Sequence, residues 1–382
     1  MSTRWAATRW STSTTCPAAR LGCMPMPTAS TQSCATAWRS CAARSSPLLA
    51  PARSCVRAAT PPAASEQRLQ EETMFDALVA ADLSVDDPDE RARQLVDVLG
   101  LPELKPSWTI DVPGQFKVYF LRPNHRRVGA PTYLEVIGPH PEGGYDPWFT
   151  HLHALQGARP MKTHSMNFAV PEPLELVERF RSLGVQYRLG EAIPDEESPY
   201  TRLFVGQSPS DPNNYDPTFD AGLMIEFVPT WALALRDETV QPIIPEGLAS
   251  GAPIRVASRA VIVGDLDATV ATLERYLDLA PSRYIDSPIE NIRVAVYEGS
   301  IASSARLEIM SPVGDGPVAD HLAQFGDGHY RVAMSVNGLS HAVDRLVDRG
   351  IGFSRGDDAL YGERVSIDPN VLGGLLIDLV EC

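Results

Sequence analysis

An acidic residue recurs in four strand-like segments, each time between apolar neighbours. These residues are Glu135 in TYLEVIGP, Glu226 in GLMIEFVP, Glu308 in ARLEIMSP and Asp378 in GLLIDLVE. A carboxylate in such a place is costly to bury unless it meets a cation or hydrogen-bond donors. The four residues are therefore candidates for acid–base chemistry or for holding a metal ion. The plain alternative is that they pair with arginines or with water.

Each acid closes one copy of a four-fold repeat. The copies open with ADLSVDDPDERARQLVDVLGL, MNFAVPEPLELVERFRSLGV, RAVIVGDLDATVATLERYLDL and VAMSVNGLSHAVDRLVDRGI. In each copy a short alternating strand ends at a valine, and a turn-rich stretch then caps an amphipathic helix. Three further alternating stretches follow each helix. The sequence therefore predicts an α+β protein built from four βαβββ modules.

The landmarks of the repeat keep a regular spacing. The opening strands end at Val85, Val170, Val263 and Val336. The helices are expected to end 15, 14, 15 and 14 residues later, near Gly100, Gly184, Asp278 and Gly350. Glycine at such a position is typical of the left-handed C-terminal cap. The alternation of 15 and 14 favours pairing the first copy with the second and the third with the fourth.

This plan resembles the vicinal oxygen chelate (VOC) superfamily, which includes glyoxalase I, bleomycin-resistance proteins, methylmalonyl-CoA epimerase and extradiol dioxygenases. In that family two βαβββ modules pair into a curved sheet that cups one site. The resemblance covers about residues 75–381. It implies a first VOC domain at residues 75–230 and a second at 254–382, joined by a linker at 231–253.

The resemblance also implies metal ligands on the opening strands, usually His, and on the closing strands, usually Glu. A divalent metal held in this way can bind two neighbouring oxygens of a substrate. Glu135 and Glu226 match the closing positions of the first domain, and we expect both to act in catalysis. The opening positions, five residues before the valines, hold no usual ligand: Ala80, Ser165, Ser258 and Arg331.

His164 lies beside the missing ligand position of the first domain. Strand alternation turns it to the opposite face from Ser165, unless a bulge or a one-residue slip restores it. One interpretation is a metal site of His164, Glu135 and Glu226 that holds Fe, Mn, Ni or Zn. The other places His164 at the edge of the connection between modules. In both cases Asp82, Ser165 and Asn167 are expected to line the cup and contact a ligand.

The second domain is a weaker candidate for a metal. Arg331 occupies its ligand position, where it would repel a cation. It is expected to pair with Asp378 or to bind an anionic ligand, so both residues are ligand-binding candidates. His329 lies seven residues before Val336, displaced along the strand. Ring cleavage by a metal in this domain is therefore not expected.

Three roles follow from the resemblance. The first is an enzyme of the glyoxalase or dioxygenase type, a lyase, isomerase or dioxygenase acting on a small oxygen-rich molecule with a divalent metal in the first domain. The alternative is a metal-free protein of the bleomycin-resistance kind, which binds a small organic ligand. In the third role, the second domain serves only packing or dimerisation. This is reasonable because βαβββ modules pair readily, and pairing between two copies of the chain would give a homodimer.

Composition separates residues 1–65 from the rest. This stretch holds seven arginines, five of the six cysteines and no acidic residue, as expected of a disordered tail or of a start codon placed before a true start near Met74. The remainder carries all 48 acidic residues, which excludes general nucleic-acid binding. Apolar runs stay short of the ~20 residues that cross a bilayer. With Cys382 as its only cysteine, this part fits a reducing cytoplasm.

Overall fold

The computed structural model describes residues 75–104, 109–123, 131–142, 147–190, 202–211, 213–233 and 248–381 of the 382-residue chain. The N-terminal stretch expected to be disordered, Met74 and most of the linker expected at 231–253 lie outside these residues. The domain boundaries therefore stay predictions. We keep the names first and second domain for residues 75–230 and 254–382.

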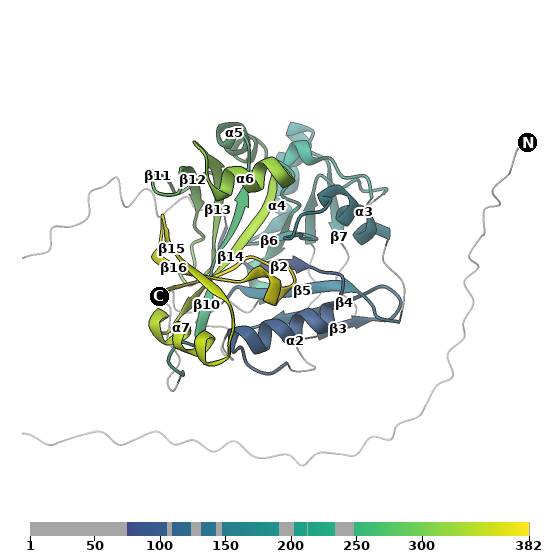
Figure 1. Cartoon of the computed structure of the whole chain (residues 1–382). Helices are drawn as coiled ribbons and strands as arrows, with labels where there is room; N and C mark the ends of the chain where they lie inside the picture. The colour runs from purple at the N-terminus through teal and green to yellow at the C-terminus, as the bar shows by residue number, and fades with distance from the viewer. Residues whose placement is uncertain are drawn as a thin grey trace, which may run out of the picture. The chain divides into compact units, whose positions relative to one another are not determined.

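The repeat predicted from the sequence is present as four βαβββ modules, which confirms the fold class (Figure 1). The first module contains β2 (Ala80–Ser84), α2 (Pro88–Leu99), β3 (Thr109–Val112), β4 (Phe116–Leu121) and β5 (Tyr133–Pro139). The second contains β6 (Met166–Val170), α4 (Pro173–Leu183), β7 (Tyr187–Gly190), β8 (Arg202–Val205) and β9 (Ile225–Pro229).

The second domain repeats the same order of elements. The third module contains β10 (Pro253–Ile262), α5 (Leu266–Leu277), β11 (Arg283–Ser287), β12 (Ile292–Tyr297) and β13 (Arg306–Pro312). The fourth contains β14 (Gly328–Val336), α7 (Leu339–Asp348), β15 (Phe353–Asp358), β16 (Gly362–Ile367) and β17 (Ile377–Glu381). Helices α3 (Pro147–Gln156) and α6 (Pro317–Phe325) join the two modules of each domain. The 3₁₀ segments η2 (Pro217–Phe219) and η4 (Pro369–Leu372) precede the closing strands β9 and β17, and η3 (Thr230–Leu233) follows β9.

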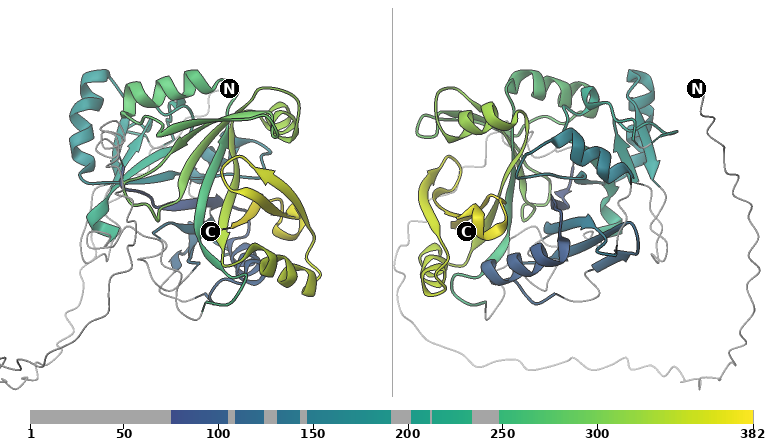
Figure 2. Two further views of the ribbon diagram at one scale, coloured as in Figure 1. Left: turned by 90° about the vertical axis from the view of Figure 1, so that its left-hand side faces the viewer. Right: turned by 45° about the vertical axis from the view of Figure 1, so that its right-hand side comes forward.

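The two domains assemble their strands differently. In the second, the long strands β10 and β14 pair antiparallel, side by side in Figure 2, within one eight-stranded sheet ordered β11-β12-β13-β10-β14-β17-β16-β15. In the first, the opening strand is divided at Val79. Its first part, β1 (Ala77–Leu78), joins the sheet β1-β6-β9-β8-β7, and β2 joins the sheet β2-β5-β4-β3.

Local sequence explains where the helices begin and end. The Asp87 carboxylate accepts a 2.9 Å hydrogen bond from the backbone N–H of Glu90, which caps α2. Gly100 then takes a left-handed conformation after the last turn, with φ of 69°. Asp265 caps α5 in the same way, and Asp278 ends it with φ of 60°. The cap signals of the sequence are thus met at both ends of these helices.

Strand alternation decides which residues are available for a site. Along β5, Leu134 and Val136 are buried in the main hydrophobic core, which also contains Leu95 and Leu99 of α2. Glu135 lies between them and points to the opposite face. The helix-covered face is therefore apolar, and the polar residues of the first domain gather on the other face.

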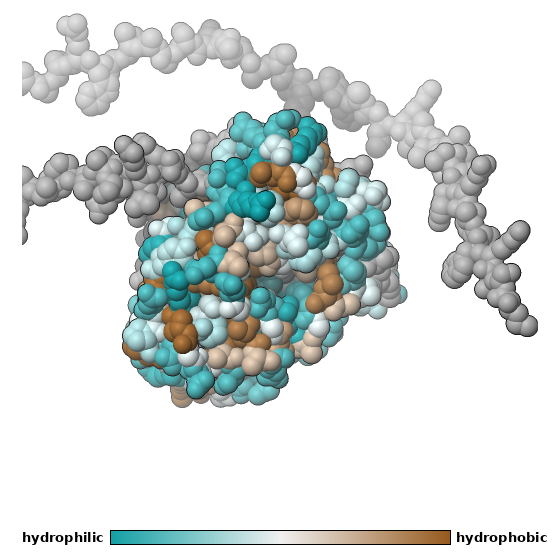
Figure 3. Space-filling view, turned by 90° about the horizontal axis from the view of Figure 1, so that it is seen from above, coloured by the Kyte–Doolittle hydropathy of each residue, from teal (hydrophilic) through white to brown (hydrophobic). Residues whose placement is uncertain are grey.

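No helix of the described ranges is long and apolar enough to cross a membrane. The face seen from above is largely hydrophilic, with separate hydrophobic areas (Figure 3).

Candidate functional site

The strand register of the first domain brings carboxylates next to polar residues. Asp82 on β2 lies opposite Glu135 on the parallel strand β5. Asn167 on β6 lies opposite Glu226 on the parallel strand β9. Residues opposite each other on parallel neighbours point to the same face. The register therefore places Asp82 and Asn167 beside the closing-strand acids, two residues beyond the positions obtained by counting from the valines.

His164 is held against the first of these pairs. Its backbone N–H donates to Oδ1 of Asp82, and its ring Nδ1 lies 2.7 Å from Oδ2 of the same carboxylate. Thr163 also donates its hydroxyl to Oδ1 of Asp82 at 2.7 Å. His164 precedes β6, which begins at Met166, so strand alternation does not fix the direction of its side chain. This is why the imidazole can enter the cup.

The far edge of the imidazole faces the other acids. Nε2 of His164 lies 3.8 Å from Oε1 of Glu135 and 3.2 Å from the hydroxyl of Ser165. Ser165 donates its hydroxyl to Glu226 at 2.9 Å, and Asn167 donates to the same oxygen at 2.7 Å. We call these six residues the first cup: Asp82, Glu135, His164, Ser165, Asn167 and Glu226.

Burial and mutual repulsion change the proton affinities in the first cup. Burial raises the pKa of Glu135 to about 8, and it outweighs the nearby imidazole, which favours the ionised carboxylate. Burial opposes protonation of His164, yet the carboxylates of Asp82 and Glu135 raise its pKa to about 9. Among the described residues, none donates a hydrogen bond to the carboxylate of Glu135. That carboxylate is thus desolvated and still has room for a cation or a proton.

The donor set fits a divalent metal ion. Asp82, Glu135 and His164 each offer a ligand atom within 4.8 Å of the others, and they form the one such cluster in the described ranges. Glu226 is a third carboxylate in the same cup, with Arg202 3.6 Å away. Three acids facing one imidazole and one half-exposed arginine leave an excess of negative charge. Carboxylate oxygen and imidazole nitrogen are ligands that Mn, Fe, Ni and Zn accept.

Comparison with known families supports the fold of the second domain directly. Residues 259–364 match the family model described as the Glyoxalase/Bleomycin resistance protein/Dioxygenase superfamily. All four modules share the βαβββ order of elements with this matched segment. The family match is confined to this segment of the second domain, and the first domain shares its order of elements. No curated protein matches the chain in a sequence search.

Solved structures of VOC proteins resemble the chain at low identity. Methylmalonyl-CoA epimerase from Mycobacterium tuberculosis covers 36% of this chain and 92% of its own, with 22% identity and a TM-score of 0.32. A mutant 4-hydroxymandelate synthase from Streptomyces coelicolor covers 80% of this chain and 92% of its own, with 16% identity and a TM-score of 0.48. At these values the likenesses say nothing about the reaction.

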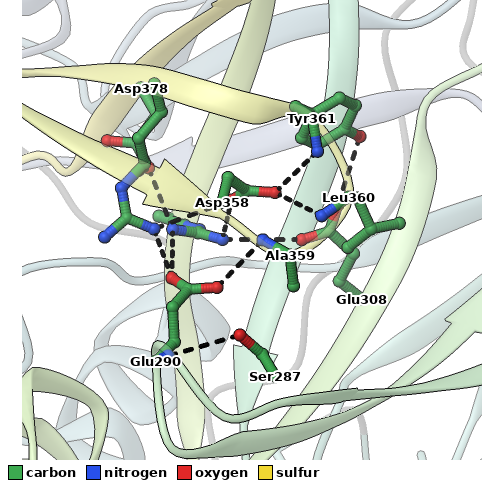
Figure 4. A network of polar contacts seen from close by, with 10 residues as sticks. Ser287, Glu290, Glu308, Asp358, Ala359, Leu360, Tyr361 and Asp378 are labelled. Carbon is green, nitrogen blue, oxygen red and sulfur yellow. Dashed lines mark hydrogen bonds and ion pairs between the residues drawn. The ribbon is translucent and has the colours of Figure 1, made fainter.

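The second domain fills its cup with ion pairs. Arg331 on β14 is buried and lies 3.1 Å from Asp378 and 2.5 Å from Asp358. Arg364 on β16 lies 2.5 Å from Glu290, whose carboxylate is also 3.9 Å from Arg331. Figure 4 shows Glu290, Asp358 and Asp378 converging on the two guanidinium groups. We call this group the second cup: Glu290, Glu308, Arg331, Asp358, Tyr361, Arg364 and Asp378.

The charges of the second cup stabilise one another. Burial alone would lower the pKa of Arg331, but Asp378 and Asp358 raise it above its ordinary value. Glu308, the closing acid of the third module, is buried and accepts a 3.2 Å hydrogen bond from Tyr361. Burial raises its pKa, although Arg331 opposes this. This cup thus supplies two arginines of the chain as partners for its four acids.

The structure thus groups the residues singled out in the sequence into two sets. Six lie in the first cup: Asp82, Glu135, His164, Ser165, Asn167 and Glu226. Two form the ion pair of the second cup: Arg331 and Asp378. Sequence reasoning missed five that contact them, namely Thr163, Arg202, Glu290, Asp358 and Arg364. Most lie in hairpins or connections, where spacing alone gives no register.

Proposed function

We propose that the first cup binds one divalent metal ion, Fe, Mn, Ni or Zn, and that the chain acts as an enzyme on a small oxygen-rich organic molecule. The observation that supports this is the cluster of Asp82, Glu135 and His164 on the polar face of the first domain. When bound, such an ion polarises two neighbouring oxygens of a substrate as a Lewis acid. The reaction class is that of a lyase, isomerase or dioxygenase.

Asp82 and His164 have different roles in the proposed metal site. Asp82 accepts from Nδ1 of His164, which leaves Nε2 on the side of Glu135 and Ser165. A carboxylate in this place fixes the tautomer and the orientation of a metal-binding imidazole. Asp82 therefore orients the ring, and Nε2 is the atom of His164 that would hold the ion.

The two closing acids are suited to different tasks. Glu226 is fixed by Ser165, Asn167 and Arg202, as a metal ligand needs to be. Glu135 has a pKa of about 8 and no hydrogen-bond donor among the described residues. A carboxylate whose pKa lies near the working pH can exchange protons in both directions. Glu135 is therefore the group that takes a proton from the substrate and returns it.

A metal-free binding protein is the second candidate function. Both oxygens of Asp82 already accept hydrogen bonds from Thr163 and His164, and Glu226 accepts two. The carboxylates of the first cup therefore have part of their hydrogen bonds without a cation. In a metal-free protein, the same polar groups would bind a small organic ligand.

A test for substrate turnover distinguishes the metal-dependent enzyme from the metal-free binding protein. The full-length chain, loaded with Mn, Fe, Ni or Zn in turn, would be incubated with a hemithioacetal, a branched acyl-CoA thioester and a catechol. The enzyme hypothesis expects metal-dependent conversion of one of these classes, lost in Glu135→Gln and retained in Glu308→Gln, the matched change in the second cup. Saturable binding without conversion, equal with and without metal, would favour the binding protein instead.

A further inference from the structure

Two buried polar side chains outside both cups, Arg259 and His329, each have atoms without a hydrogen-bond partner among the described residues. Arg259 on β10 and His329 on β14 have exposed fractions of only 2% and 4%. Nη1 and Nη2 of Arg259 and Nε2 of His329 have no hydrogen-bond partner among the described residues. Buried polar atoms are nearly always paired, so three orphans on two neighbouring strands indicate a missing ligand.

All of the orphan atoms are donors. Nε of Arg259 donates to Nδ1 of His329 at 3.2 Å, so Nδ1 is the accepting nitrogen of the ring. Burial, with Arg259 and Arg159 nearby, holds the pKa of His329 well below its usual range, and the ring is neutral. A neutral imidazole that accepts at Nδ1 carries its proton on Nε2. The group therefore presents guanidinium N–H and imidazole N–H bonds and no acceptor.

Among the described residues, none forms an ion pair with Arg259. Burial lowers its pKa to about 10, and the one carboxylate that opposes this is Asp82, which makes no ion pair with Arg259. Keeping an arginine buried without a partner is strongly unfavourable. An anion beside Arg259 would remove that cost, and guanidinium matches a carboxylate in both charge and geometry.

His329 lines a cavity of about 210 Å³, and Arg259, which donates to its ring, lies behind it and outside the lining. The wall is polar at His329, Arg159, Gln156, Tyr215 and Asp327, and apolar over much of the rest, including Val261, Val263 and Met224. Val261 lies directly opposite His329 in the sheet and two residues beyond Arg259 on the same strand face. The volume is below the roughly 300–1,000 Å³ typical of sites for drug-sized ligands, so the occupant is small.

Arg159 is held at this cavity by the backbone of the fourth module. Its Nε donates to the carbonyl of Phe325 at 3.0 Å. A Cβ on Gly328 would lie 2.7 Å from Nη1 of Arg159, so the glycine leaves the space that the guanidinium uses. Asp327 also lines the cavity, and its carboxylate accepts from the backbone N–H of Gly264.

We propose that this cavity binds a small organic carboxylate, with Nε2–H of His329 as the buried donor, Arg159 as a cation in the wall, and Arg259 as the buried positive charge behind His329 that fixes its ring. The unpaired donors select an anion, and the apolar wall favours a hydrocarbon body over inorganic phosphate. The site is separate from the first cup and does not depend on a metal there.

Ligand-induced stabilisation of the full-length chain tests this site. Melting temperatures would be recorded with the sodium carboxylates from acetate to hexanoate, with phosphate, and with butyramide as an uncharged control, at constant ionic strength. Saturable stabilisation by a carboxylate and none by butyramide is expected. Arg259→Met, which removes the charge but keeps the bulk, should weaken the apparent affinity about tenfold or more. Arg255→Met, on the same strand, should leave it unchanged.

A second readout is independent of stability. With ¹⁵N-labelled histidine, the signals of His329, assigned through His329→Gln, should show the Nε2–H form and should shift when the carboxylate is added. Equal effects on wild type and Arg259→Met, or no saturable effect of any carboxylate on both readouts, would overturn the proposal. Saturation by phosphate alone would overturn the carboxylate and assign an inorganic anion.

Discussion

The two cups are built from the same βαβββ modules, but different residues surround their buried carboxylates. Glu135 and Glu226 occupy the closing strands of one pair of modules, and Glu308 and Asp378 those of the other. The second cup supplies two arginines for its acids, whereas the first supplies one imidazole and a half-exposed arginine. The closing acids are thus common to both cups, and the cations around them are what differs.

Arg331 accounts for much of the difference. It comes from the opening strand of the fourth module, at the place where Ser165 stands in the second. Its guanidinium lies within 4.0 Å of Glu290, Glu308, Asp358 and Asp378. A serine cannot neutralise a carboxylate, so the first cup lacks the cation that Arg331 supplies to the second.

Breaking the second cup should give the largest effect on stability. Arg331→Met would leave Asp358 and Asp378 buried without their main partner, and should lower the free energy of unfolding by about 3–5 kcal/mol. Arg202→Met, the parallel change in the first cup, removes a partly buried cation but leaves Glu226 its hydrogen bonds from Ser165 and Asn167, so it should cost less, about 1–2 kcal/mol. Urea denaturation measures both. Equal losses would contradict the contrast between the two cups.

Changing the carboxylate that orients His164 should next affect metal affinity. Asp82→Asn should weaken metal binding by about 10–100-fold, because the imidazole loses the acceptor that fixes its Nδ1–H tautomer. Calorimetric titration of the metal-stripped chain measures this. Asp378→Asn is the matched control in the second cup, and it should leave the affinity unchanged. An equal loss in the two variants would point to a general effect on folding.

Sequence patterns were sufficient to predict the four modules, but they could not predict the direction of the His164 side chain. Periodicity and cap residues such as Asp87 and Gly100 are local signals, so the βαβββ order could be predicted from them. The direction of His164 depends on where β6 begins, and a start at Met166 frees this residue from strand alternation. Counting from valines also missed the register that sets Asp82 opposite Glu135.

Partners from distant hairpins could not be predicted. Glu290 lies in the turn between β11 and β12 of the third module, yet it pairs with Arg364 of the fourth. Such contacts depend on how two modules curve around one face. The pairing of Arg331 with Asp378, by contrast, was accessible because adjacent parallel strands carry both residues.

Proton binding gives the first cup a pH dependence of its own. In the folded chain the pKa of Glu135 is about 8 against an ordinary 4.5, so the folded state keeps a proton that the unfolded state loses, and stability falls as pH rises from 4.5 towards 8. The raised pKa of His164 adds stability below 6.5 that is lost as pH rises through about 9. Denaturation of the metal-free chain across this range, compared with Glu135→Gln, should show the slope and its reduction.

Metal binding should follow the opposite trend. Because the ion displaces a proton from His164, its affinity should increase with pH up to about 9 and then level off. Calorimetry at several pH values checks this. An affinity independent of pH would show that His164 is not a ligand.

The smallest effect is expected from the hydroxyl between His164 and Glu226. Ser165→Ala removes one hydrogen bond to the Glu226 carboxylate, while Asn167 keeps the other. The loss should be about 1–2 kcal/mol in the free energy of unfolding. Tyr361→Phe, which removes the hydroxyl bonded to Glu308, is the matched change in the second cup and should cost a similar amount. Urea denaturation resolves both.

The most direct test is the metal content of the full-length chain, purified without chelator or histidine tag and measured by elemental mass spectrometry. Near one equivalent of Fe, Mn, Ni or Zn is expected in the wild type and in Glu308→Gln, and almost none in Glu226→Gln. That pattern would place the ion in the first cup. No metal in the wild type after reconstitution, or equal loss in both variants, would contradict the proposed metal centre.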